Sequence, residues 1–273
     1  MWDALLDALF DTLNIIPILF LVYLIIEFIA HSDNFHSSVI KAKKFGPLIG
    51  GTLGIFPQCG FSSAMADLYS KRSITIGTLF AVFIATSDEA IVIMLAYPNF
   101  ILNLLLLIAV KFVAAVIIGY LIDIITKSYK KINRDINQSY YVENHCECNI
   151  LKETIIQTLQ ISLFVFVATF LINVLLLLVP IESFTLSSNK FVQALITPLI
   201  GLIPNCASSI FLVELYINNL LYFGSLIGGL SAGSGVGLLV LFRKNKNFKE
   251  NLLILFTLYS IGAVLGLFIN IFC

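Results

Sequence analysis

The chain has 273 residues, of which 59% are hydrophobic and 12% are charged, with a formal net charge of zero and a mean hydropathy of +0.99. This composition predicts an all-α integral membrane protein and argues against a soluble protein or a nucleic-acid partner. The five cysteines have no regular spacing, so they do not indicate the disulfide framework of a secreted domain.

The first membrane span is predicted at Leu9–Ile29, an apolar run long enough to cross a bilayer. The acidic start of the chain lacks the basic region of a secretory signal, so we expect this run to be retained. The next apolar run, Phe45–Ser70, is interrupted at Pro57 and has basic residues on both flanks. Because basic flanks favour the cytoplasm, we predict a re-entrant hairpin that enters and leaves from the cytoplasmic side.

A helix over Ile74–Leu95, a short outer turn at Tyr97–Asn99 and a helix over Ile101–Ile125 are expected next. They complete a first membrane repeat, residues 1–126. The linker that follows, residues 127–151, begins with a run of basic residues and is expected in the cytoplasm.

The second half, residues 152–273, is predicted to contain the same order of parts: a span, a segment broken at Pro204 and two further spans, at Ile155–Val179, Phe191–Tyr216, Tyr222–Leu241 and Leu252–Ile271. If the broken segment is a hairpin entered from outside, fourteen of the sixteen Lys and Arg residues lie in the cytoplasm and both termini lie outside. This arrangement predicts two inverted-topology repeats with about ten membrane segments in a bacterial inner membrane, and it leaves a homo-oligomer open.

The two breaks have related sequences. Gly54-Ile-Phe-Pro-Gln-Cys-Gly60 returns 147 positions later as Gly201-Leu-Ile-Pro-Asn-Cys-Ala207, and matches at this spacing continue as far as Ser87 and Ser234. We interpret them as an internal duplication. In lipid a broken helix is tolerated only where it is buried in protein or lines a wet cavity, so two breaks indicate one shared site. Such a plan is typical of secondary transporters, which bind their substrate between discontinuous helices.

Four motifs, PQCGFS, TSDE, PNCASS and SAGSGVGLLVLFR, together resemble the bacterial heavy-metal exporters often called manganese transporters or arsenic efflux proteins, which are related to the organoarsenical permeases. The resemblance spans nearly the whole chain and implies a ten-segment protein that exports a metal or metalloid. It also implies a His- and Cys-rich cytosolic loop, which is here reduced to His145-Cys146-Glu147-Cys148. This loop is either a transient capture site, through His145, Cys146 and Cys148, or a plain tether.

Candidate substrate-binding residues occupy matched positions in the two halves. Cys59 and Cys206 are thiols suited to soft ions, or small residues at a close helix contact, and Gln58 and Asn205 either coordinate a cation or cap the broken helices. Ser87 and Ser234 are matched as well. Asp67 and Glu214 match near the hairpin mouths, where an interfacial acid needs no special role.

Asp88 and Glu89 lie within an apolar helix, where acids are costly, so they are expected to bind a divalent cation or couple its transport to protons. Lys111 is the one Lys or Arg expected within the membrane; it is either a partner for these acids or a counter-ion that replaces the transported cation. We expect Lys111 to be buried toward the bundle.

Enzyme functions are disfavoured by missing motifs. A zinc metalloprotease would need HExxH, and a rhomboid-like protease would need a histidine partner for Ser234, yet none follows His145. The absence of GxxxxGK[ST] argues against direct ATP use, so no cofactor is expected and proton antiport is the expected coupling. Export of a divalent, manganese-like cation is the preferred reading, with Asp88, Glu89, Cys59 and Cys206 as metal ligands. An arsenite, organoarsenical or organic-anion carrier and a channel remain the alternatives.

Overall fold

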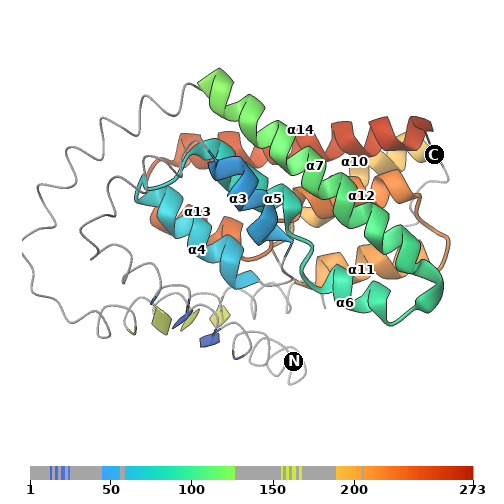
Figure 1. The fold of residues 1–273 in the computed structure, drawn as a ribbon, viewed down its shortest axis with the longest axis horizontal. Helices are drawn as coiled ribbons and strands as arrows, with labels where there is room; N and C mark the ends of the chain where they lie inside the picture. Colours follow the sequence, from blue (N-terminus) through green and yellow to red (C-terminus); the bar gives the residue numbers. More distant parts are fainter. Residues whose placement is uncertain are drawn as a thin grey trace, which may run out of the picture.

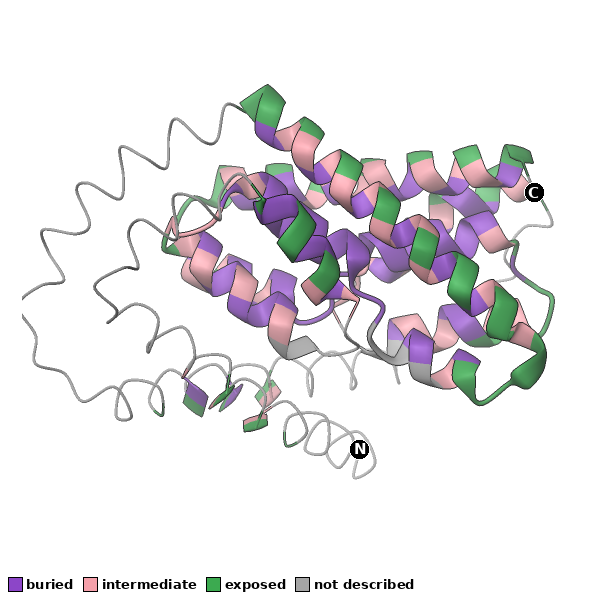
Figure 2. Ribbon diagram, viewed as in Figure 1, coloured by how far each residue is buried: buried purple, intermediate pink, exposed green. Residues whose placement is uncertain are grey.

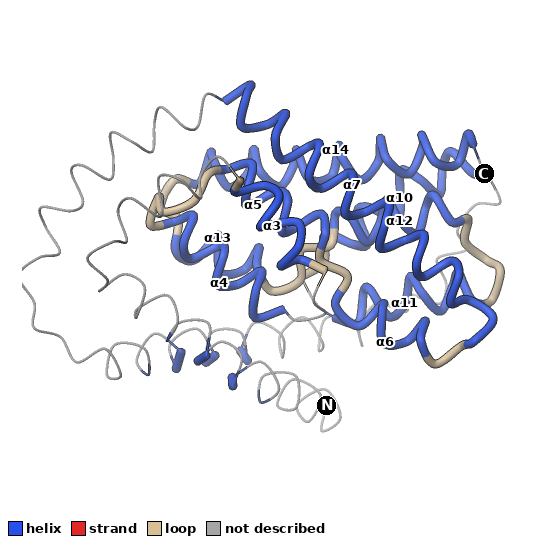
Figure 3. The backbone as a smooth tube through the Cα atoms, viewed as in Figure 1, coloured by secondary structure: helices blue, strands red, loops and turns tan. Residues whose placement is uncertain are grey.

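The computed structural model describes residues 45–55, 59–126, 189–204 and 206–272, with a few further helical positions between 13 and 24 and between 155 and 167. Within these ranges the chain is helical, with one 3-10 turn and no β-strand (Figure 3). The helices are α3 (Gly46–Gly54), α4 (Cys59–Ser70), α5 (Ile76–Ala85), α6 (Asp88–Leu95), α7 (Ile101–Thr126), α10 (Lys190–Gly201), α11 (Cys206–Ile217), α12 (Phe223–Ala232), α13 (Gly237–Lys244) and α14 (Phe248–Phe272). The linker 127–151, and the predicted spans Leu9–Ile29 and Ile155–Val179 apart from those positions, lie outside the described residues.

Three stretches of the described chain are long and apolar enough to cross a membrane: Pro98–Thr126, Phe223–Lys244 and Phe248–Phe272. Helix α7 confirms the span predicted at Ile101–Ile125, and α14 confirms the last predicted span while beginning four residues earlier. Figure 2 shows exposed residues along one face of α7 and of α14. Many of them are leucine, isoleucine or phenylalanine. An apolar surface of this kind is what a membrane-embedded helix presents to lipid.

Helix bounds in the second half repeat those in the first half at the spacing of 147. Helix α11 begins and ends 147 positions after α4, and α12 begins and ends 147 positions after α5. Helix α10 ends 147 positions after α3 ends, and α14 begins 147 positions after α7 begins. The packing repeats too, because α3 and α7 lie against α5 as α10 and α14 lie against α12. Figure 2 shows α5 and α12 as the buried centre of the described fold.

Glycines allow these helices to approach closely. A Cβ on Gly77 would stand 2.1 Å from the carbonyl oxygen of Gly119, and a Cβ on Gly201 would stand 2.0 Å from that of Gly229. Helix pairs in a membrane gain their stability from such close contact, since lipid offers no hydrophobic driving force between helices. Small residues therefore fix the crossing points in both halves.

The bundle has two distinct ends. One end, which we call the basic end, brings the α4–α5 turn together with the α13–α14 turn and holds Lys71, Arg72, Arg243, Lys244, Lys246 and Lys249. Contact between the two turns is made by Arg72, which forms an ion pair with Glu250 at 2.6 Å. The other end, which we call the Tyr216 end, holds Tyr216 next to Asn103, with Asn103 Nδ2 donating to the tyrosine hydroxyl at 2.6 Å.

Helix α3 begins at the basic end, and helix α4 ends there. Gly46, at the start of α3, lies beside Thr75 and Thr78 at the start of α5, and α4 leads back into the same region through Lys71. Helix α10 begins at the Tyr216 end, and helix α11 ends there. Near the start of α10, Gln193 donates to the carbonyl of Leu220, which follows α11, at 3.0 Å. The start of α3 and the end of α4 thus lie at the basic end, and the start of α10 and the end of α11 lie at the Tyr216 end.

One short helix from each half packs against a helix of the other half. Helix α4 packs against α13, and α11 packs against α6, so that these pairs lie side by side in Figure 1. The contact between α4 and α13 is especially close, since a Cβ on Gly237 would stand 3.0 Å from Cβ of Ser62. The two halves are therefore interlocked rather than merely adjacent.

Two predicted helices are corrected. The chain predicted as continuous over Ile74–Leu95 is divided into α5 and α6, and the chain predicted over Tyr222–Leu241 is divided into α12 and α13. Sequence periodicity did not reveal these breaks because both flanks are apolar. A signal was nevertheless present: a serine followed by two acids is typical of a helix start, and Gly233-Ser234-Gly235 is typical of a turn.

Candidate functional site

Two breaks in the buried helices form the centre of the candidate site. At the first, Thr86 leaves the helical conformation with a ψ of 130°, and its hydroxyl donates back to the carbonyl of Val82 at 2.7 Å. At the second, α12 ends at Ala232 and Gly235 adopts a φ of 52°, which suits glycine. Each break frees backbone carbonyls that a continuous helix would have paired.

Lys111 joins the two breaks. Its ammonium donates to the carbonyl of Thr86 at 2.5 Å and to the carbonyl of Leu230 at 2.8 Å, and the residue is only 1% exposed. The prediction that Lys111 is buried toward the bundle is confirmed. A cation held by carbonyls from both halves shows that this point in the fold stabilises positive charge.

The helix pairs reach the same level as the breaks. Gly54, the last residue of α3, lies against Ala85 and the amide of Thr86, while Gly201, the last residue of α10, lies within 3.3 Å of a Cβ built on Gly233. The ends of α3 and α10, which lead into the two proline motifs, therefore adjoin the breaks in α5–α6 and α12–α13. Four interruptions of helical structure meet in one region.

The predicted site residues are placed as follows. Ser87 and Ser234 lie in the two breaks and are 4% and 1% exposed. Cys59 and Cys206 are the first residues of α4 and α11, and Asp88 and Glu89 are the first residues of α6; for these four the structure describes the backbone and not the side chain. Gln58, Asn205, His145, Cys146 and Cys148 lie outside the described residues.

The position of Asp88 and Glu89 differs from the expected one. Instead of interrupting a long helix, they open α6, whose N-terminus carries partial positive charge that stabilises acids. This placement lowers the cost of having two acids in the membrane. It also brings their backbone directly after Thr86, whose carbonyl binds Lys111.

Sequence reasoning missed one hydroxyl at the centre. Ser231, in the last turn of α12, is 0% exposed, and its hydroxyl has no hydrogen-bond partner; the same holds for the hydroxyl of Ser234. No sequence signal singled out Ser231, because its matched position in the first half is Ile84. The second break therefore has two buried hydroxyls three positions apart.

A second charged cluster lies at the basic end. Asp67, expected to be an interfacial acid, is buried at 1% exposure and pairs with Lys71 at 3.2 Å and Lys244 at 3.8 Å. Arg72 holds Glu250 through two hydrogen bonds of 2.6 and 2.7 Å, and the Tyr69 hydroxyl donates to the same carboxylate. Hydrogen bonding to Glu250 raises the pKa of the Arg72 guanidinium, so Arg72 stays charged.

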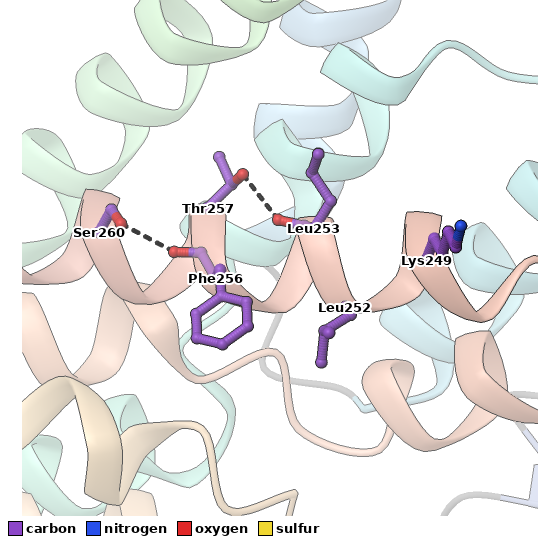
Figure 4. A pocket seen from close by; sticks show the side chains of 6 residues that line it. All are labelled: Lys249, Leu252, Leu253, Phe256, Thr257 and Ser260. Carbon is purple, nitrogen blue, oxygen red and sulfur yellow. Dashed lines mark hydrogen bonds between the residues drawn. The ribbon is translucent and has the colours of Figure 1, made fainter.

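A surface groove of about 450 Å³ lies apart from this centre, along the outer side of α14 (Figure 4). Its walls are largely apolar, and its two hydroxyls are used within the helix: Thr257 donates to the carbonyl of Leu253 and Ser260 to that of Phe256. Among the side chains that the structure describes, no group of three His, Cys, Asp or Glu could hold a metal ion.

Comparison with known proteins identifies a family. The family model described as "Putative, 10TM heavy-metal exporter" (ArsP_2) matches residues 1–187. No curated protein and no solved structure matches the chain. The family description agrees with the membrane-spanning helices of the fold. The chain therefore belongs to the ArsP_2 family of ten-segment heavy-metal exporters.

Proposed function

We propose that this protein is a secondary transporter that exports a divalent, manganese-like metal cation by alternating access around the centre where the four helix interruptions meet. The observation that supports it best is the ammonium of Lys111, held by the carbonyls of Thr86 and Leu230. Oxygen atoms arranged to stabilise an ammonium also suit a hard metal ion.

The proposal places the two halves in the membrane as inverted repeats. The basic end faces the cytoplasm, as the distribution of Lys and Arg favours, and the Tyr216 end faces outward. Helix pairs α3–α4 and α10–α11 are then re-entrant hairpins that enter from opposite sides of a bacterial inner membrane. Support comes from the contacts of Gly46 with Thr78 and of Gln193 with Leu220, which are expected if both arms of each pair lie at one end.

Metal binding would draw on residues of both halves. The carboxylates of Asp88 and Glu89 supply negative charge beside the first break, and Cys59 and Cys206 stand at the starts of the returning hairpin arms. Gln58, Asn205, Ser87 and Ser234 complete the lining. Oxygen ligands suit manganese, and the thiols extend the range toward softer ions.

In the proposed transport cycle, the Lys111 ammonium competes with the metal ion for the same carbonyl oxygens. When the metal leaves, the tethered ammonium occupies the two carbonyls, and an arriving metal must displace it. The matched residue in the second half is the buried Leu258, so the protein has this tethered cation in one half alone. A single competing charge would prevent both carbonyls from standing unpaired in an empty carrier.

Export can be tested with everted membrane vesicles that contain the protein and are supplied with Mn²⁺, Cd²⁺ or arsenite. Uptake of Mn²⁺ should be saturable and should be lost in Asp88→Asn/Glu89→Gln. In Cys59→Ser/Cys206→Ser, Mn²⁺ uptake should fall less than Cd²⁺ uptake. If the thiols are essential for every substrate and the acids dispensable, the protein is a soft-metal or arsenite exporter instead.

An organic-anion or oxyanion carrier is the second candidate, favoured by the positive charge of Lys111 and by the N-termini of α4 and α11 at the centre. Radiolabelled anion flux that survives loss of both the acid pair and the cysteine pair would support it. Unitary currents in planar bilayers would point to a channel.

A further inference from the structure

Ser231 and Ser234 are the buried hydroxyls that remain unpaired at the second break. Serine in a helix ordinarily donates to the carbonyl three or four residues earlier, as Ser260 does on α14. Neither hydroxyl does so here, although they are 0% and 1% exposed. A buried hydroxyl without a partner is costly, and its persistence indicates that a ligand or water completes it.

The position of the pair points to the transported ion. Ser231 directly follows Leu230, whose carbonyl receives Lys111, and Gly233, between the two serines, lies beside the carbonyl of Gly201 at the tip of α10. The two serines therefore belong to the chain segment whose backbone already stabilises a cation. At the position matching Ser231 the first half has Ile84, so this hydroxyl belongs to the second half alone.

We propose that Ser231 and Ser234 are a ligand pair for the transported divalent cation, with Ser231 a specificity-determining residue that favours hard ions. This inference rests on the proposed function and adds a residue to its site. Hydroxyl oxygen coordinates hard cations such as Mn²⁺, whereas a thiol at the same place would favour soft ions such as Cd²⁺.

The same helix offers a matched control. Ser225 of α12 is also 0% exposed, yet its hydroxyl accepts a hydrogen bond from Asn270 at 2.8 Å. Ser225→Ala should lower the unfolding temperature and leave the KM for Mn²⁺ in everted vesicles unchanged. Ser231→Ala should raise that KM by roughly tenfold or more, without lowering the unfolding temperature, because it removes no internal hydrogen bond.

A cysteine variant tests the ion preference separately. Ser231→Cys should weaken Mn²⁺ transport and strengthen Cd²⁺ transport relative to the unaltered protein. The inference is overturned if Ser231→Ala keeps the original KM, or if it destabilises the protein as Ser225→Ala does. Failure of the proposed function would look different, since the unaltered protein would then transport none of Mn²⁺, Zn²⁺ and Cd²⁺, and that outcome overturns both.

A separate observation concerns how the basic end is closed. Tyr69 bonds Glu250 at this end, and the residues at the two matching positions, Tyr216 and Asn103, bond each other at the Tyr216 end. The basic end adds charge to this shared contact, because Arg72 clamps Glu250 with two hydrogen bonds. At the position matching Arg72 the other end has the neutral Asn219.

We infer that the Tyr69–Arg72–Glu250 cluster is a latch that holds the basic end closed, while its uncharged counterpart opens more readily. The cluster ties α4 and the α4–α5 turn to the start of α14, at the opposite end of α4 from the close contact of Ser62 with Gly237. A paired guanidinium and carboxylate, each partly shielded from solvent, form a stronger link than an exposed pair.

Labelling of Ser62→Cys by a membrane-impermeant thiol reagent in everted vesicles tests the latch, with modification at residue 62 read by peptide mass spectrometry. Glu250→Gln should accelerate labelling by roughly tenfold. Asn103→Ala, at the other end, should not accelerate it. Labelling that is unchanged in Glu250→Gln, or equally fast in Asn103→Ala, would overturn the latch whether or not the protein transports metal.

Discussion

Arg72 and Asn219 adopt the same left-handed backbone conformation, each with a φ of 59°, although they lie 147 positions apart. They are the non-glycine residues with positive φ among the described residues, and each lies in the turn that follows α4 or α11. The amides of both also donate to matched carbonyls, those of Tyr69 and Tyr216. The two turns are the same structural device at opposite ends of the bundle.

This conformation predicts a stability difference at Asn219. Alanine pays a cost of about 1 kcal/mol in the left-handed region that asparagine partly avoids and glycine does not pay. Asn219→Ala should therefore lower the free energy of unfolding by about 1 kcal/mol, and Asn219→Gly should keep it near the original value. Denaturant unfolding in detergent measures both, with Asn218→Ala as the neighbouring control. Equal stability of the Ala and Gly variants would show that the turn is not constrained.

Close helix contact predicts a steep response at Gly201. A Cβ there would stand 2.0 Å from the carbonyl oxygen of Gly229, and only a backbone shift could relieve the overlap. Gly201→Ala should destabilise the protein by about 1–3 kcal/mol or prevent folding. Gly266→Ala, where the nearest atom is 3.2 Å away, should be much milder. Unfolding temperatures in detergent that are equal for the two variants would contradict the packing of α10 on α12.

Removal of the Lys111 ammonium should destabilise the empty protein and enhance its response to metal. Lys111→Met leaves the carbonyls of Thr86 and Leu230 buried without their donor, at a cost of about 1–3 kcal/mol for each. Because no ammonium then competes, saturating Mn²⁺ should raise the unfolding temperature of this variant more than that of the unaltered protein. Leu258→Met, at the matched position, should change neither quantity greatly. An identical metal response in both proteins would remove the competition from the mechanism.

Orientation in the membrane can be measured by cysteine labelling from each side. Single cysteines at Lys43 and Lys71 should react from the cytoplasmic side, and one at Lys190 from outside. The reason is that basic residues on both flanks of the first broken segment favour the cytoplasm. Reaction of Lys43→Cys and Lys71→Cys from opposite sides would mean that the segment crosses the membrane, and the inverted repeat would be wrong.

The sequence by itself determined the class of protein and showed that one motif recurs in its two halves. Apolar runs of membrane length, basic loops and a proline motif repeated at a spacing of 147 are local features that survive without any knowledge of packing. The span at Ile101–Ile125 was predictable for the same reason, since α7 is predominantly apolar over 26 residues. The family resemblance also followed from short motifs, and the family model agrees with it.

Tertiary structure alone decided where the helices break and what meets there. The divisions at Thr86–Ser87 and Gly233–Val236 lie within apolar runs, where a break is stabilised by partners from other helices and not by local sequence. The carbonyl of Leu230 reaches Lys111 across 119 positions, and Glu250 reaches Arg72 across 178. Contacts at such distances depend on how the halves interlock, so periodicity along the chain cannot specify them.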